Sequence, residues 1–160
     1  MQLHGHRLQD DRVTRPHQKM KPDRTNPPGE LSIRVYYEDT DTGGVVYYAN
    51  YLKFFERGRT EWLRALGMDQ HTLATQEQMM FVVKHADIAY RQPARLDDRI
   101  LVRTSVTGLG ASTIRFGQQA LRDDTLLASA DIQVCTVHAI SFKPIRLPPS
   151  IRDLLEKALH

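Results

Sequence analysis

Apolar and polar residues alternate in several stretches of this chain. Residues 31–37 read LSIRVYY, and Leu31, Ile33 and Val35 alternate there with other residues. This period of two predicts a strand with one buried face. Four more stretches carry strand signals: 79–91, 99–107, 111–121 and 125–138. The pattern is cleanest in 99–107, one side of which holds Ile100, Val102, Thr104 and Val106.

A period of three to four residues runs through 50–66 and predicts a long helix. Asn50 is the expected N-cap, and Gly67 is a natural stop after the last turn. One face of this helix carries Tyr51, Phe55, Gly58, Trp62 and Leu66, and Leu52, Phe54 and Leu63 widen it. The helix should be about 25 Å long and largely buried. Gly58 in its middle indicates that another backbone approaches closely.

Two shorter segments complete the pattern. Residues 69–77 are predicted to be a short polar helix or loop, and Ser150 with Asp153 forms a capping-box pattern for a terminal helix. Strands grouped after a helix, rather than alternating with helices, indicate an α+β fold. We expect an antiparallel sheet of about five strands wrapped round the long helix. The edges and outer face of such a sheet need a partner, which predicts a homo-oligomer.

Residues 1–29 differ in composition from the rest of the chain. They are polar, contain four prolines, and hold six Lys/Arg against three Asp/Glu. Because they offer little apolar surface to bury, we expect a disordered basic tail at 1–29 and one folded domain at 30–160. The remaining residues carry sixteen charges of each sign. The folded body therefore gives no electrostatic support for nucleic-acid binding.

Size and residue usage place the chain among globular proteins. Its 160 residues, 41% of them hydrophobic, suit one domain with a core. No stretch reaches the roughly 18 apolar residues of a membrane span, and the first residues lack the apolar centre of a signal peptide. Cys135 is the single cysteine, so no internal disulfide forms and a buried, inert thiol is expected. These features predict a cytoplasmic protein.

The candidate chemistry lies in residues 36–50, YYEDTDTGGVVYYAN. Glu38, Asp39 and Asp41 precede a glycine pair, and the helix follows. One interpretation is a surface turn that uses Asp and Gly for their backbone preferences. A calcium loop fits poorly, because the position that needs glutamate holds Asn50. The other interpretation is a reactive site, in which amides at the helix start stabilise an oxyanion and a carboxylate attacks or activates water.

Other parts of the chain offer few rival catalysts. The sequence has no G-x-S-x-G motif. His85 and His138 lie within predicted strands and lack the spacing of zinc ligands, so ordinary strand histidines are expected there. Arg59 and Glu61 on the helix are interpreted as ion-paired rather than catalytic.

Residues 34–63, RVYYEDTDTGGVVYYANYLKFFERGRTEWL, resemble the signature of the 4-hydroxybenzoyl-CoA thioesterase class of hotdog-fold proteins. Within that class, the chain is most similar to bacterial acyl-CoA thioesterases associated with the Tol–Pal envelope system. The similarity continues through FVVKHADIAYRQPARLDD at 81–98 and KPIRLPPSI at 143–151. It implies a hotdog fold, an antiparallel sheet around the long helix, in homodimers that often pair into homotetramers.

The resemblance also implies an activity and a set of site residues. The expected reaction is hydrolysis of an acyl-CoA, or of a thioester on acyl carrier protein, without a metal or an organic cofactor. Asp41 is expected to act as nucleophile or general base, and the backbone amide of Tyr48 as the oxyanion donor. The positions expected to contact substrate are Gly44, Val45, Val46, Tyr47 and Asn50.

The identity of residue 48 leaves the acyl group open. The Tol–Pal-associated proteins commonly carry histidine at this position, whereas tyrosine also occurs in the hydroxybenzoyl-CoA branch. Tyr48 keeps the backbone amide, so the oxyanion role is unaffected. CoA phosphates call for cations at the mouth of the site, and the candidates are Lys84, Arg91 and Arg95.

Two other functions compete with thioester hydrolysis. A hotdog dehydratase needs a histidine across the pocket from an acid, and residues 31–70 contain no histidine. A non-catalytic protein that binds acyl-CoA or acyl carrier protein would keep the fold, but it has little use for Asp41 beside a thioester. Thioester hydrolysis is therefore the function that the sequence favours.

Overall fold

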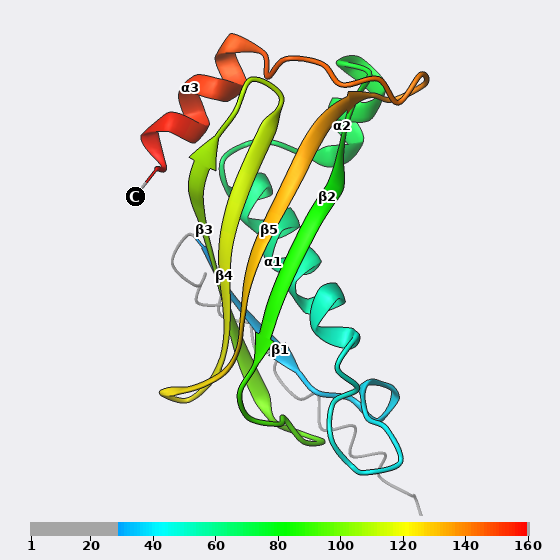
Figure 1. The fold of residues 1–160 in the computed structure, drawn as a ribbon, viewed down its shortest axis with the longest axis vertical. Coiled ribbons are helices and arrows are strands. Elements are labelled where there is room, and N and C mark those ends of the chain that lie inside the picture. The colour runs from blue at the N-terminus through cyan, green and yellow to red at the C-terminus, as the bar shows by residue number, and fades with distance from the viewer. Residues whose placement is uncertain (1–28, 160) are drawn as a thin grey trace, which may run out of the picture.

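The computed structural model describes residues 29–159, which form one antiparallel sheet with helices (Figure 1). The five strands lie in the order β1-β3-β4-β5-β2. Their bounds are β1 (Glu30–Arg34), β2 (Met79–Tyr90), β3 (Arg99–Leu109), β4 (Thr113–Arg122) and β5 (Thr125–His138). The predicted α+β fold with a five-stranded antiparallel sheet is confirmed. The disorder predicted for the tail concerns residues that lie, apart from Gly29, outside this description.

Three α-helices accompany the sheet in the described part of the chain. They are α1 (Asn50–Ala65), α2 (Gln70–Gln76) and α3 (Pro149–Lys157). Figure 1 shows α1 lying across one face of the curved sheet, where it contacts β1 and β3. None of these helices is long and apolar enough to cross a bilayer.

The core lies between α1 and the inner face of the sheet. Phe54 and Phe55 of α1 are fully buried there, as are Ile100 and Val102 of β3. The alternation predicted for residues 99–107 is thus confirmed, with one side of β3 facing the helix. Burying an aromatic or branched apolar side chain contributes about 1.5–3 kcal/mol, so the four side chains named here contribute several kcal/mol to stability.

Of the two predicted ends of α1, the C-terminal end is confirmed and the N-cap is not. Gly67 ends the helix as expected, with φ +85°, while the amides of Met68 and Gly67 donate to the carbonyls of Leu63 and Arg64. This is the Schellman arrangement, which favours glycine. The predicted N-cap is wrong: Ala49 occupies the cap, and Asn50 is the first helical residue. The side chain of Asn50 instead donates to the carbonyl oxygen of Asp39 at 2.8 Å.

Gly58 lies where α1 packs tightly against side chains of β3 and β4. A Cβ atom at this position would lie 2.7 Å from Cγ1 of Val102 and 2.9 Å from Oγ1 of Thr104. The predicted close approach is therefore present, but side chains make it rather than a backbone. The adjacent Gln118 is buried, and its Nε2 donates to the Phe55 carbonyl and to Oγ1 of Thr104. These bonds tie α1 to β3 and β4.

Arg59 also departs from its predicted role. It is 8% exposed, and its Nη1 donates to Oε1 of Gln118 at 2.9 Å. Burial lowers the pKa of the Arg59 guanidinium, against the opposing effect of Glu56. The ion pair predicted for Glu61 is present, with Arg64 as the partner. Arg59 thus belongs to the buried polar network of Gln118, and within residues 29–159 it forms no ion pair.

One predicted strand end and one predicted helix cap are also wrong. The strand predicted at 31–37 ends at Arg34, although the backbone of Val35 still exchanges hydrogen bonds with Asp97 and Asp98. The capping box predicted for the terminal helix is absent, because Pro148 takes the cap of α3 and no side chain caps it. Pro149 follows at the first helical position, where a missing N–H has no cost.

Candidate functional site

A small hairpin carries the acidic loop of the sequence. The amide of Asp41 donates to the carbonyl of Val45 at 2.9 Å, and the amide of Tyr47 donates to the carbonyl of Asp39 at 3.0 Å. Thr40 pairs with Val46 between these bonds. The turn at 41–44 therefore projects from the body of the protein just before α1 begins.

Asp41 lies at the base of this turn with its carboxylate exposed. Its Oδ1 accepts a hydrogen bond from the amide of Gly43 at 2.8 Å, whereas Oδ2 has no donor among residues 29–159. A Cβ on Gly43 would lie 3.1 Å from that Oδ1, so glycine leaves the carboxylate its place. Gly44 has φ +75°, a conformation that side chains disfavour. The turn thus holds one carboxylate oxygen and leaves the other accessible.

The neighbouring acids have other environments. Oδ2 of Asp39 accepts the amide of Tyr36 at 2.8 Å, which closes the short 3₁₀ turn at Tyr37–Asp39. Glu38 is exposed in the same turn. Asp39 and Asp41 therefore each use one carboxylate oxygen to hold a backbone amide, but Asp39 is half-buried whereas Asp41 is exposed.

Tyr48 lies immediately before α1. Its amide and that of Ala49 find no acceptor within residues 29–159, whereas the amide of Asn50 donates to the carbonyl of Tyr47 at 2.9 Å. The amide of Tyr51 donates to the carbonyl of Tyr48 at 3.3 Å. Unpaired amides at a helix start, together with the helix dipole, favour negative charge there. The Tyr48 amide can therefore donate to a developing oxyanion.

A hollow of about 270 Å³ opens beside Tyr48. Its lining consists of Val46, Tyr48, Tyr51, Tyr90, Arg91, Gln92 and Pro93. Tyr90 stands with its ring edge-on to Tyr48, at 6.0 Å between ring centres, and to Tyr51 at 5.5 Å. Asp41 does not line this hollow, so a single chain brings Tyr48 and Val46 together there but not the candidate acid.

Of the residues predicted to contact substrate, some line the hollow beside Tyr48 or pack against its ring, and the others hold or extend the hairpin. Tyr47 is half-exposed, and its ring packs at 4.9 Å against that of Tyr48; hydrogen bonding to Tyr48 raises the pKa of Tyr47. Val46 lines the hollow and is buried, while Val45 pairs with Arg95. Gly44 lies at the exposed tip of the turn. Together with Asn50, the valines mainly hold the hairpin in place.

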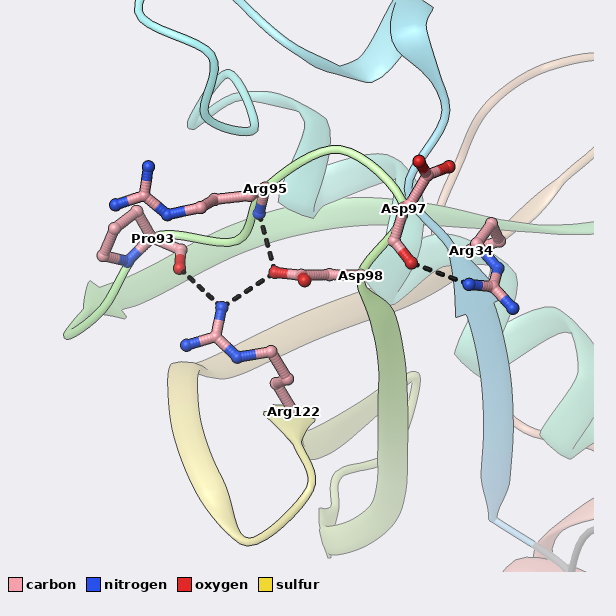
Figure 2. Close-up of polar contacts among 6 residues, drawn as sticks. All are labelled: Arg34, Pro93, Arg95, Asp97, Asp98 and Arg122. Atoms are coloured by element: carbon pink, nitrogen blue, oxygen red, sulfur yellow. Dashed lines mark hydrogen bonds and ion pairs between the residues drawn. The ribbon is translucent and has the colours of Figure 1, made fainter.

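The loop 93–98 supports this hairpin from the other side. The amide of Val46 donates to the carbonyl of Ala94 at 2.8 Å. Figure 2 shows how Asp98 organises the loop: its Oδ2 accepts the amide of Arg95 and Nη1 of Arg122, each at 2.8 Å. Burial alone would raise the pKa of the Asp98 carboxyl, but the Arg95 amide and the Arg122 guanidinium hold it below its usual range.

Further bonds join the loop to strands β4 and β1. Nη1 of Arg122 also donates to the carbonyl of Pro93, and Nη1 of Arg34 donates to the carbonyl of Asp97 at 2.7 Å (Figure 2). The sequence patterns predicted neither this network nor a role for Tyr90. The available signal was the PARLDD segment, since turn residues end the strand there. Arg122, the partner of Asp98 in this segment, lies at the end of β4, 24 positions along the chain.

The candidate cations for CoA phosphates lie at different places. Arg91 lines the hollow, Lys84 is exposed on β2, and the guanidinium of Arg95 extends away from Asp98 in Figure 2. Of the two strand histidines, His85 is exposed, and Nε2 of His138 pairs with Oε1 of Gln78. In residues 29–159 no group of three His, Cys, Asp or Glu side chains is arranged to hold a metal.

Comparison with known proteins identifies relatives over most of the folded chain. The model of the thioesterase-like superfamily matches residues 35–155. Acyl-CoA thioesterase YbgC of Haemophilus influenzae is 46% identical over 120 residues, 75% of this chain and 88% of the relative. Acyl-CoA thioester hydrolase YbgC of Escherichia coli O157:H7 is 43% identical over 120 residues, 74% of this chain and 89% of the relative.

A solved structure supports the same relationship. The probable thioesterase from Bartonella henselae superimposes with a TM-score of 0.72 at 36% sequence identity, over 74% of this chain and 98% of that protein. The hotdog fold expected from the sequence is confirmed by this similarity. An association with the Tol–Pal system stays a prediction, and the acyl group that the protein prefers stays open.

Proposed function

This chain belongs to the thioesterase-like superfamily, and from this premise we propose that it is an acyl-CoA thioesterase with its site at the start of α1. The reaction adds water to the thioester carbonyl and releases a carboxylic acid and the CoA thiol. The single observation that carries the assignment of the site is the free amide of Tyr48, beside a hollow and at the N-terminus of a 16-residue helix.

The Tyr48 amide supplies electrostatic stabilisation. When a nucleophile attacks the thioester carbon, the carbonyl oxygen becomes an oxyanion, and this amide donates to it. The positive end of the α1 dipole lies behind the same amide. A single oxyanion donor of this kind accelerates acyl transfer by about 10²- to 10³-fold.

Asp41 supplies the carboxylate, through its accessible Oδ2. In one route Oδ2 takes a proton from water while that water attacks the carbonyl carbon. In the other route Oδ2 attacks the carbon itself, the thiolate leaves, and water then hydrolyses the resulting anhydride. In both routes the C–S bond breaks, the thiolate takes up a proton, and Asp41 is regenerated.

The acyl chain is proposed to lie in a groove between α1 and β2. This groove has a volume of about 390 Å³ and begins at Leu52, one helical turn beyond Tyr48. Its walls are largely apolar, with Phe81 and Val83 from β2 and Phe116 from β4. An acyl chain whose carbonyl oxygen is bound by the Tyr48 amide would extend into this groove first. Arg91, in the hollow, and Arg95 would meet the CoA phosphates.

A second copy of the chain is proposed to complete the site. Asp41 and Tyr48 are both exposed in one chain. The 12-residue strand β2 lies at one edge of the sheet, where an unpaired strand can pair with another chain. A homodimer through β2, alone or within a homotetramer, would cover the α1–β2 groove. Hydrolysis of acyl-carrier-protein thioesters and a cytoplasmic location stay predictions.

The experiment that tests this function measures thiol release from a panel of thioesters. The panel runs from short to long aliphatic acyl-CoAs, adds hydroxybenzoyl-CoA, and includes an acyl carrier protein thioester. Asp41→Asn should lower kcat by about 10²- to 10⁴-fold while the fold, checked by circular dichroism, is retained. Substrate binding without turnover by the wild type would support the binding-protein alternative instead.

The Tyr48 amide can be tested separately from its side chain. Tyr48 is the second residue of the turn closed by the Asn50 amide on the Tyr47 carbonyl, a position that accepts proline. Tyr48→Pro removes the amide hydrogen and should lower kcat by about 10²-fold. Tyr48→Ala also removes the ring but keeps the amide, and is the matched control. An equal loss in both variants would contradict the oxyanion assignment.

A further inference from the structure

We infer that Tyr90 is a positioning residue for this reaction, because its hydroxyl fixes the carbonyl of Tyr48 and with it the backbone that begins α1. The inference rests on the proposed function. Its basis is one long-range bond: the Tyr90 hydroxyl donates to the Tyr48 carbonyl oxygen at 3.0 Å, across 42 positions of sequence.

The backbone on the N-terminal side of Tyr48 is already held. The Tyr47 carbonyl accepts the amide of Asn50 at 2.9 Å, and the Tyr47 amide donates to the Asp39 carbonyl at 3.0 Å. The peptide that contains the Tyr48 amide is therefore anchored at Tyr47. On the C-terminal side, the only other bond to the Tyr48 carbonyl within residues 29–159 is the longer one from the Tyr51 amide, at 3.3 Å. Tyr90 supplies the shorter bond on that side.

Tyr90 itself is fixed by the sheet. It is the last residue of β2 and pairs with Ala128 of β5. The next amide, of Arg91, donates to the carbonyl of Leu127 at 2.8 Å. The Tyr90 ring stands edge-on to the rings of Tyr48 and Tyr51, which restricts its rotation. A rigid strand end thus holds the helix start through one phenol group.

The protonation state of Tyr90 suits this role. Burial, followed by the nearby Tyr48, raises the pKa of the Tyr90 phenol. The hydroxyl therefore keeps its proton and donates throughout the neutral and mildly alkaline range. Accepting this bond also polarises the Tyr48–Ala49 peptide, whose N–H is the second free amide at the helix start. Misplacement of a catalytic group by an ångström can cost about 10²-fold in rate, so a single anchor here has a measurable effect.

The test is Tyr90→Phe, which removes the hydroxyl and keeps the ring. With the preferred acyl-CoA, kcat should fall about tenfold, while KM changes less than about twofold and Tm stays within about 2 °C. Tyr37→Phe, which removes a hydroxyl from a tyrosine that is 82% exposed, is the matched control and should keep wild-type kcat. Tyr90→Leu, which also removes the ring contacts, should lower Tm as well as kcat.

Amide hydrogen exchange gives a readout that does not depend on turnover. The Tyr51 amide shares the Tyr48 carbonyl as its acceptor, so its exchange should be faster in Tyr90→Phe than in wild type. Two results for Tyr90→Phe would overturn this inference: an unchanged kcat, or a loss of kcat accompanied by a matching loss of Tm. If wild type is active and Asp41→Asn is not, either result leaves the proposed function standing. A wild type without turnover on any thioester would contradict the proposed function and the inference with it.

Discussion

At the scale of single residues, Asp98 is a carboxylate that supports the candidate site without a part in the proposed reaction. It holds the 93–98 loop through the Arg95 amide and Arg122, and that loop accepts the amide of Val46 through Ala94. Val46 in turn lies within the hairpin that ends beside Tyr48. The position of the proposed oxyanion donor therefore depends on the ion pair of Asp98 with Arg122, which lies outside the hollow beside Tyr48.

The depressed pKa of Asp98 gives a prediction about stability and pH. A carboxyl whose pKa is lower in the folded state stabilises the fold above its unfolded pKa, near 3.9, and this contribution is lost as pH falls through the folded value. Asp98→Asn should therefore lower the free energy of unfolding by about 2 kcal/mol at pH 7 and by progressively less below about pH 4. Urea unfolding between pH 3 and 7 measures this difference.

A second aspartate provides the control for Asp98. Asp124 is exposed in the turn between β4 and β5, so Asp124→Asn should change the free energy of unfolding at pH 7 by less than about 0.5 kcal/mol. Curves for wild type and Asp98→Asn that remain parallel over the whole range would contradict the role given to the Asp98 carboxylate.

At the scale of elements, the contact between α1 and the sheet depends on a missing side chain. Gly58 lets Val102 and Thr104 approach the helix within van der Waals contact, and the same approach brings Gln118 to the Phe55 carbonyl. A buried amide that loses its partners costs about 1–3 kcal/mol. The helix position and the polar network are therefore coupled.

Gly58→Val should accordingly destabilise the protein, although valine has the higher helix propensity. Overpacking of this kind costs about 1–3 kcal/mol, which corresponds to a decrease of several degrees in Tm for a domain of this size. Thermal unfolding measures the change. Arg57→Val introduces the same side chain at the neighbouring exposed position of α1 and should change stability by less than about 0.5 kcal/mol. Equal effects of the two variants would show that packing at Gly58 is not the cause.

The elements predicted well are those whose signals are local. Alternation in 99–107 gives the buried side of β3, and Gly67 marks the end of α1, because strand period and left-handed backbone depend on adjacent residues. The start of α1 could not be predicted in the same way. Asn50 favours a cap in isolation, but in the fold its amide group binds the Asp39 carbonyl 11 positions away.

The residues of the candidate site likewise differ in whether local sequence predicts them. Asp41, Gly43 and the hairpin follow from a short acidic and glycine-rich segment, and the structure places them in one turn. The partners that hold this segment, Tyr90 and Ala94, come from distant parts of the chain. A single sequence gives no measure of which distant residues meet, so these supporting contacts required the three-dimensional structure.

At the scale of the whole molecule, the open edge of β2 is the feature that connects fold and assembly. β2 pairs with β5 on one side, and its other side has no strand in the described chain. Val83, 53% exposed, lies near the middle of β2 and lines the α1–β2 groove. A two-fold symmetric pairing of β2 would bring the middle of the strand close to its own copy.

Val83→Lys should therefore prevent the proposed dimer, because two new cations would meet near the two-fold axis beside Lys84 of each copy. Sedimentation velocity should show a shift from the dimer toward the monomer mass of 18.4 kDa. Activity should fall with it, since the groove and the exposed Asp41 would lose their cover and the groove, which Val83 lines, would gain a charge. Leu154→Lys on α3, which replaces an exposed leucine far from β2 in sequence, should remain dimeric and active. A Val83→Lys protein that stays dimeric would place the interface elsewhere, and a monomeric, fully active wild type would show that one chain contains the complete site.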